Sequence, residues 1–144
     1  MFEESAPRPH ALHVIAAIYL FALLLAVTSY GHPFPFLGRF YSGAAGEWLV
    51  FADSLICLYL FLGVLKRQRL TVWLMIAYNL FDIVNAWVNL TLIPAEAYGQ
   101  LASARIAESE LRSTTIAAAL VLVFITVFLF ANRRHFNNRS PYLF

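Results

Sequence analysis

The sequence predicts an all-α fold, an antiparallel four-helix transmembrane bundle, from two observations. Hydrophobic residues make up 61% of the chain and charged residues only 12%, with a mean hydropathy of +0.70, whereas soluble domains carry about 25% charged residues. Four apolar runs are each close to the ~20 residues that a helix needs to cross about 30 Å of hydrocarbon. These runs cover residues 11–30, 47–65, 70–93 and 113–132. Backbone polar groups find no water in lipid, so each run should be helical, and residues 1–144 are interpreted as a single integral membrane domain.

The first run is interpreted as a retained helix rather than a secretory signal. Glu3 and Glu4 precede it where a signal peptide carries positive charge, and no small-residue cleavage site follows it. The connection after it, residues 31–46, contains two prolines and four glycines among several aromatic residues. Prolines and glycines interrupt helices, and aromatic side chains suit the headgroup region. We expect an interfacial loop here, or alternatively a lid over an outward-facing site.

The distribution of basic residues predicts the orientation of the bundle. A loop of a few residues joins the second and third runs and makes these helices antiparallel neighbours. Seven of the ten Lys and Arg residues would lie on the same side as this loop. They are Arg8, Lys66, Arg67, Arg69, Arg133, Arg134 and Arg139. The positive-inside rule then places both termini in the cytoplasm, and we expect a bacterial inner membrane.

The fourth helix is predicted to extend beyond the membrane on the outer side. From Leu101 onward the residues are good helix formers, and neither Gly nor Pro interrupts them before the fourth apolar run. Arg105, Glu108 and Arg112 then have the spacing of surface ion pairs on one helix. We therefore expect several turns of helix outside the membrane.

Several function classes are excluded or disfavoured by what the sequence contains. Cys57 is the only cysteine, so the chain cannot form an internal disulfide, and a cysteine-based redox or metal site is disfavoured. The four histidines have no metal-ligand spacing, and no catalytic triad or nucleotide-binding motif is present. The basic residues form short clusters at segment ends, which does not indicate nucleic-acid binding. The sequence therefore predicts no catalytic residue and no metal ligand, and it identifies no cofactor.

The third run carries polar residues deep in the membrane, where an ionisable group raises the free energy of membrane insertion by at least ~2.5 kcal/mol. At 100° per residue, one narrow face of this helix collects most of them, Asn79 lies at its edge, and Trp73 and Trp87 point elsewhere. The members of this face, here called the seam, are Thr71, Met75, Tyr78, Asp82, Asn85 and Asn89. Such an ordered face is expected to point toward the bundle or toward a protein partner.

The second run contributes a carboxylate at a matching depth. Asp53 and Asp82 are each about 13 residues from the basic residues of the short loop, or ~20 Å along their helices. If the two carboxylates face each other, they cannot both ionise without a large cost. One of them would take up a proton, or the pair would bind a cation.

The leading expectation is a non-enzymatic protein that binds or conducts a small polar or cationic solute, a proton or an ion. The residues of this ligand-binding site would be Asp53, Tyr78, Asn79, Asp82, Asn85 and Asn89. The same side chains could instead only hydrogen-bond the helices together. A second alternative is an accessory or assembly subunit that docks the seam onto a larger membrane complex or another copy. A third is a membrane enzyme that acts on a lipid-like substrate with its carboxylate pair.

Overall fold

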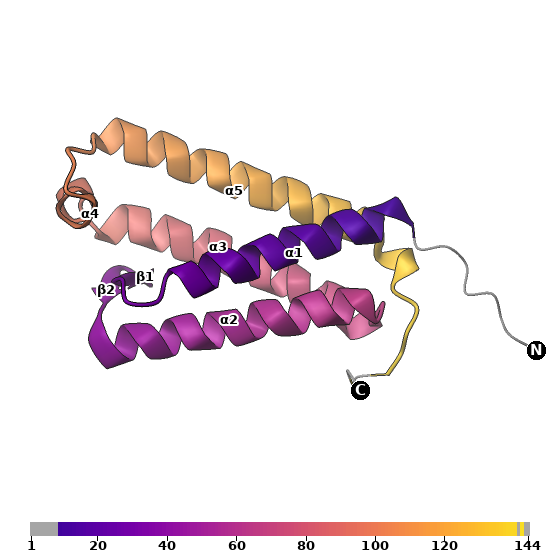
Figure 1. Ribbon diagram of the computed structural model, residues 1–144. Helices are drawn as coiled ribbons and strands as arrows, with labels where there is room; N and C mark the ends of the chain where they lie inside the picture. The colour runs from indigo at the N-terminus through magenta and orange to yellow at the C-terminus, as the bar shows by residue number, and fades with distance from the viewer. Residues whose placement is uncertain (1–8, 141, 143–144) are drawn as a thin grey trace, which may run out of the picture.

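The computed structural model describes residues 9–140 and residue 142, and the long elements in this part of the chain are all helices (Figure 1). The elements in order are α1 (His10–Thr28), β1 (Phe34–Phe36), β2 (Arg39–Tyr41), α2 (Gly43–Leu65), α3 (Arg69–Leu92), α4 (Ala95–Ala102), α5 (Glu108–Ala131) and the 3-10 helix η1 (Arg133–His135). The helices α1, α2, α3 and α5 are long and apolar enough to cross a membrane. The all-α prediction is confirmed, and these four helices support an integral membrane protein.

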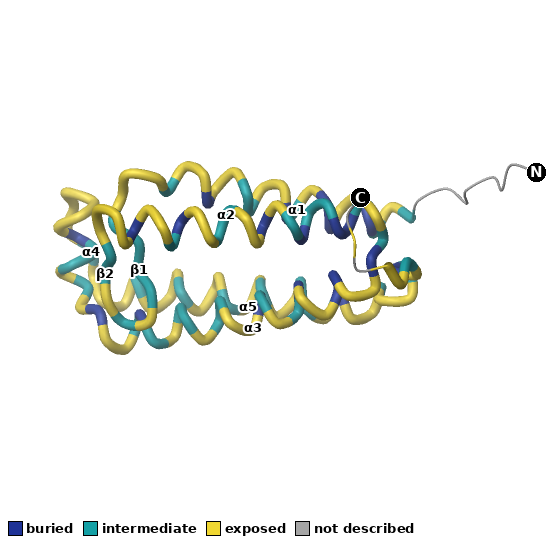
Figure 2. Tube along the Cα trace, turned by 90° about the horizontal axis from the view of Figure 1, so that it is seen from below, coloured by how far each residue is buried: buried dark blue, intermediate teal, exposed yellow. Residues whose placement is uncertain are grey.

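The four long helices form two pairs. α1 packs along α2 and α5 packs along α3, whereas α1 and α5 do not pack along each other. Figure 2 shows the pairs as two layers, with most buried positions on the sides that face each other. The main core lies at the end that carries the α2–α3 loop, here called the loop end. Its members are Leu12, Ile15, Ala16, Tyr19, Leu60, Val64, Val72, Met75, Leu129 and Phe136.

The segment after α5 returns to the α2–α3 loop and is held there by hydrogen bonds. The Arg69 backbone N–H donates to the Asn138 carbonyl (2.8 Å), and the Asn138 N–H donates to the Arg67 carbonyl (3.0 Å). Gln68 is fully buried between them, where its amide donates to the Tyr142 carbonyl (2.8 Å) and accepts a bond from Thr71 (3.0 Å). The loop end is therefore closed by both apolar packing and backbone pairing.

A β-hairpin lies at the opposite end of the bundle, here called the hairpin end. Phe34 pairs with Tyr41, and Leu37 and Gly38 form a two-residue turn with φ of 45° and 91°. Positive φ at both central residues is the geometry of a type I′ hairpin turn. The prediction of an interfacial loop over residues 31–46 did not include this hairpin. Leu37 is the reason, since leucine rarely adopts a left-handed conformation and gives no turn signal.

The prediction of one continuous outer helix from Leu101 was wrong. α4 ends at Ala102, Ser103 adopts the left-handed conformation with φ 51°, and α5 begins at Glu108. The Ala104 N–H donates to the Gly99 carbonyl (3.0 Å), so the chain turns back on α4 instead of continuing. Gly99 permits this turn, since a Cβ there would lie 2.7 Å from the Ala104 carbonyl oxygen.

The displaced helix start changes the expected ion pairs. Arg105 falls in the connection between α4 and α5, so its helical spacing to Glu108 does not apply. The pair of Glu108 with Arg112 is present at 3.8 Å, and both side chains are largely exposed. An exposed pair of this kind contributes little to stability. α5 nevertheless starts before the predicted apolar run at residue 113.

Candidate functional site

The seam on α3 faces the bundle as predicted, while the helix's tryptophans face outward. Its buried residues include Thr71, Met75 and Asn89, whereas Trp73 and Trp87 are 50% and 64% exposed. Asn79 was predicted at the edge of the seam and is instead only 2% exposed. Both α1 and α5 approach α3 at this position, so the edge of the seam becomes an interior position.

The first polar group joins α2 to α3. The Tyr78 hydroxyl donates to Asp53 Oδ1 at 2.7 Å, and Cys57 Sγ lies 3.3 Å from the same hydroxyl. A phenol has one hydrogen to donate, and here it goes to the carboxylate. The Cys57 thiol is therefore the donor to Tyr78, which gives a chain from thiol to phenol to carboxylate. This chain fixes the orientation of Asp53 within the bundle.

The second group joins α1, α3 and α5 at one residue. The Tyr19 hydroxyl donates to Asn79 Oδ1 at 2.9 Å, and Asn79 Nδ2 donates to Thr126 Oγ1 at 3.2 Å. Tyr19 is 2% exposed, so its hydroxyl group cannot hydrogen-bond to water and depends on Asn79. Asn79 was predicted to bind a solute, but both ends of its amide contact other helices. These bonds tie the two layers together, and a role of Asn79 in solute binding stays a prediction.

The third group attaches the hairpin to the seam. The Leu37 N–H donates to Asn85 Oδ1 and the Gly38 N–H donates to Asn89 Oδ1, both at 2.8 Å. A Cβ at Gly38 would lie 2.5 Å from Leu92 Cδ1, so the turn also sits close against the end of α3. Asn85 and Asn89 were predicted as solute ligands, yet their side-chain oxygens are occupied by backbone N–H groups of the turn.

Aromatic contacts complete the attachment of the hairpin. The Phe36 ring lies 5.9 Å from that of Phe81 on α3, and the Phe40 ring lies 5.0 Å from that of Tyr98 on α4. Burial in this contact raises the pKa of the Tyr98 phenol, which therefore stays neutral. The hairpin thus covers the end of the bundle and is fastened at its turn and at both strands.

Replacing both Asn85 and Asn89 by alanine is expected to loosen the hairpin without unfolding the bundle. Each lost bond is worth about 1 kcal/mol and both hold the same turn, so amide exchange at Leu37 and Gly38 should accelerate by roughly thirtyfold. Hydrogen exchange of a peptide covering residues 34–41, read by mass spectrometry, measures this. Thr91→Val is the matched control, because Thr91 is exposed on the same helix and bonds only its own backbone. Unchanged exchange in the double variant would contradict the attachment.

Asp82 differs from the other predicted site residues. Within the described part of the chain it makes no hydrogen bond or ion pair. It is partly exposed, whereas every fully buried side-chain N and O atom in the same part of the chain has a partner. Asp82 is therefore the predicted site residue most open to a ligand, and Tyr78, one turn before it on α3, links it to Asp53.

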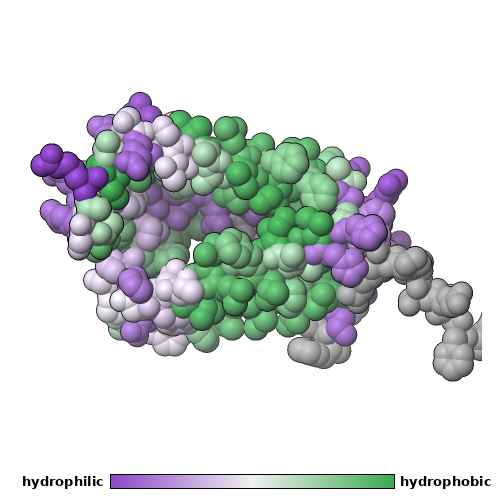
Figure 3. Space-filling view, turned by 45° about the horizontal axis from the view of Figure 1, so that its top comes forward, coloured by the Kyte–Doolittle hydropathy of each residue, from purple (hydrophilic) through white to green (hydrophobic). Residues whose placement is uncertain are grey.

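The molecular surface shows where a ligand could approach these residues. Figure 3 looks onto the side of the bundle between α5 and α1, which do not pack along each other. The surface is hollowed there, toward the hairpin end, and hydrophilic side chains lie at the bottom of the hollow. Since α3 lies between and behind these two helices, its inward-facing seam is on the side of this hollow.

Sequence reasoning left three contributors out of the site, namely Tyr19, Cys57 and Thr126. Each is a single residue in an apolar helix, and its role depends on a partner more than 20 positions away. Among the described residues, no three His, Cys, Asp or Glu side chains gather as they would around a metal ion. No protein-family model, curated protein or solved structure matches the chain. The geometry of the site is thus the basis for a functional assignment.

Proposed function

We propose that the protein binds a small cation within the membrane, at Asp82 and Asp53. The observation that carries this proposal is the lack of any protein partner for the Asp82 carboxylate in the described chain. Intramembrane carboxylates normally pair with another group or line a pathway. Two carboxylates in a low-dielectric space also repel each other. A bound cation would give Asp82 a partner and would offset this repulsion.

The donor set limits the kind of cation. Two carboxylates and the Tyr78 phenol offer oxygen atoms, and Tyr78 holds Asp53 in place through its 2.7 Å hydrogen bond. This set suits a monovalent cation, a small protonated amine or a proton, which a carboxylate pair can hold without a full metal coordination shell. The hollow between α1 and α5 would give access, and the hairpin would cover the end of the bundle.

The orientation belongs to the same proposal. The basic residues of the loop end support a cytoplasmic position for that end and for both termini, in a bacterial inner membrane. The hairpin and the hollow would then open toward the outer side. A cation would reach the carboxylates from the outside, and transport across the bilayer would need a second opening at the loop end, where the core is packed.

The proposal is tested by cation-dependent stability of the protein in nanodiscs. We expect sodium, potassium or ethylammonium chloride to raise the melting temperature of wild type, with N-methylglucamine chloride keeping the ionic strength constant. Binding at 100 times the dissociation constant stabilises by about 2.7 kcal/mol. Asp82→Asn should remove this response. Glu110→Gln, which neutralises an exposed carboxylate on α5, should keep it.

The stability of the unliganded variant separates a site from a structural contact. Asp82→Asn removes an unpaired charge, so without the cation it should be at least as stable as wild type. A carboxylate that only holds helices together would give the reverse, a less stable variant and no cation response in wild type. Proton binding would appear instead as a dependence of wild-type stability on pH that Asp82→Asn lacks.

A second candidate function is an accessory subunit, and the open side of the bundle favours it. A polar hollow between α1 and α5 would face lipid unless a helix of another membrane protein covered it. In this case Asp82→Asn should lose a partner that co-purifies with wild type in mild detergent. If the partner still co-purifies with the Asp82→Asn variant, Asp82 does not contribute to such an interface.

A further inference from the structure

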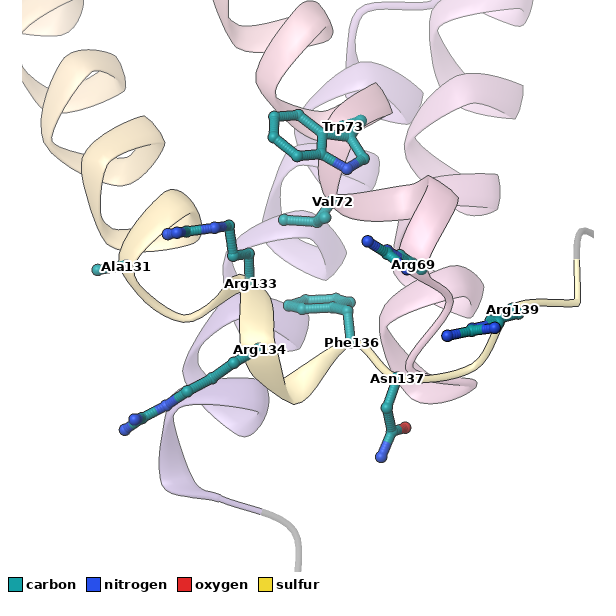
Figure 4. Close-up of a pocket in the computed structure, with 9 residues that line it drawn as sticks. All are labelled: Arg69, Val72, Trp73, Ala131, Arg133, Arg134, Phe136, Asn137 and Arg139. Carbon is teal, nitrogen blue, oxygen red and sulfur yellow. The ribbon is translucent and has the colours of Figure 1, made fainter.

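A pocket of about 540 Å³ lies at the loop end between the start of α3 and the segment that follows α5 (Figure 4). Four arginines line it together with apolar and amide side chains. The lining residues are Arg69, Val72, Trp73, Ala131, Arg133, Arg134, Phe136, Asn137 and Arg139. The backbone bond from Arg69 N–H to the Asn138 carbonyl holds Arg139 beside the first turn of α3.

Among the described residues, none near this pocket balances its positive charge. No acidic residue lines it, and the carboxylates between residues 9 and 140 all lie in the middle of the bundle or at the hairpin end. In the described chain, the guanidinium groups of Arg69, Arg134 and Arg139 make no hydrogen bond or ion pair. Arg133 is different, because it donates to the Phe130 carbonyl (2.7 Å) and stacks 4.0 Å from that ring.

The arginines differ in how they are placed for a ligand. In Figure 4 the Arg69 guanidinium points into the space beside Val72 and Phe136, and Trp73 lies above it. Arg134 points away from this space. Exposed arginine side chains change rotamer within nanoseconds, so Arg134 and Arg139 can turn toward a bound anion. Arg69 is already positioned to receive one.

One wall of the pocket is apolar and continues onto the outer face of the bundle. Trp73 is 50% exposed and packs edge-on against Phe130, which is 47% exposed, with ring centroids 6.2 Å apart. Val72 and Phe136 form the buried base. A free inorganic anion needs no such wall, whereas a lipid places its phosphate beside basic residues and its acyl chains along exposed aromatic side chains.

We propose that this pocket binds the phosphate group of an anionic phospholipid, with Arg69 and Arg139 as its principal ligands. The acyl chains lie along Trp73 and Phe130 between α3 and α5. Basic pockets between helices at the cytoplasmic end are recurrent sites for acidic headgroups. The pocket contains neither Asp53 nor Asp82, so this proposal stands or fails independently of the proposed cation site.

The test measures lipid binding to the purified full chain by native mass spectrometry. Phosphatidylglycerol and phosphatidylcholine are titrated separately in a neutral detergent, and we expect phosphatidylglycerol to bind more tightly. Arg69→Gln/Arg139→Gln should weaken its binding about thirtyfold, because each basic residue beside an anionic headgroup contributes on the order of fivefold. Arg39→Gln/Arg105→Gln, with the same charge change at exposed positions elsewhere, should leave it unchanged.

Each remaining outcome has a defined meaning. Equal binding of the two lipids, or equal losses in the two double variants, would overturn the site. Inorganic phosphate is added in large excess as a further arm. If it displaces phosphatidylglycerol completely, the pocket takes a free phosphate and the lipid assignment is overturned. Both variants should melt at the wild-type temperature in phosphatidylcholine nanodiscs, since Arg69 and Arg139 are exposed.

Discussion

A Gly63→Ala variant is expected to be less stable than wild type by about 2–3 kcal/mol. Gly63 lies on α2 where Thr71 of α3 crosses it, and an added Cβ would collide with the Thr71 side chain. Thr71 cannot move away easily, because it is fully buried and donates to the fully buried Gln68. In an exposed helix the same change would stabilise by about 1 kcal/mol, so the sign of the effect is diagnostic.

The measurement is equilibrium unfolding in a mixed detergent titrated with dodecyl sulfate. Ala52→Val is the control, since it adds carbon atoms to an exposed position on the same helix and should have little effect. Adding Thr71→Ala to Gly63→Ala should recover part of the loss, because it removes the two nearest atoms and leaves the Thr71 Cβ. A stabilising Gly63→Ala would show that α2 and α3 do not approach this closely.

The seam was predictable because its information is local. Polar residues at spacings of three and four in an apolar helix must share a face, whatever that face contacts. Tyr78 and Asp82 therefore pointed inward as expected. The depth argument also put Asp53 level with Asp82, and their juxtaposition stays a prediction. The hydrogen bond from Tyr78 to Asp53 supports it, since Tyr78 lies one turn before Asp82 on α3. The spacing and depth of charged residues along a helix are readable from the sequence alone.

The partners of the seam were not predictable, because they come from distant parts of the chain. Asn85 and Asn89 bond backbone N–H groups 48 and 51 positions away, and a backbone donor leaves no trace in the sequence. The break between α4 and α5 was missed for a related reason. Local propensity favours helix through Ser103, and the chain turns there through its contacts with Gly99.

Replacing Asn79 with alanine is expected to lower stability by roughly 2–3 kcal/mol. Two interhelical bonds would be lost, each worth about 0.6–1.7 kcal/mol in a membrane protein. The buried Tyr19 hydroxyl would also be left without its acceptor, which adds a desolvation penalty. The same unfolding titration measures the loss. Asn132→Ala is the matched control, because Asn132 bonds only the backbone of its own helix.

A double-mutant cycle shows whether Asn79 acts through Tyr19. Tyr19→Phe removes the hydroxyl, so Asn79→Ala should cost less in that background than in wild type, by about 1 kcal/mol. Additive losses would mean that the 2.9 Å bond contributes nothing. The result also bears on Asp82, which lies one turn away on α3. Asn79 is the residue that joins α1 to both α3 and α5, so its loss should let the layers shift and weaken any cation response that depends on Asp53 and Asp82.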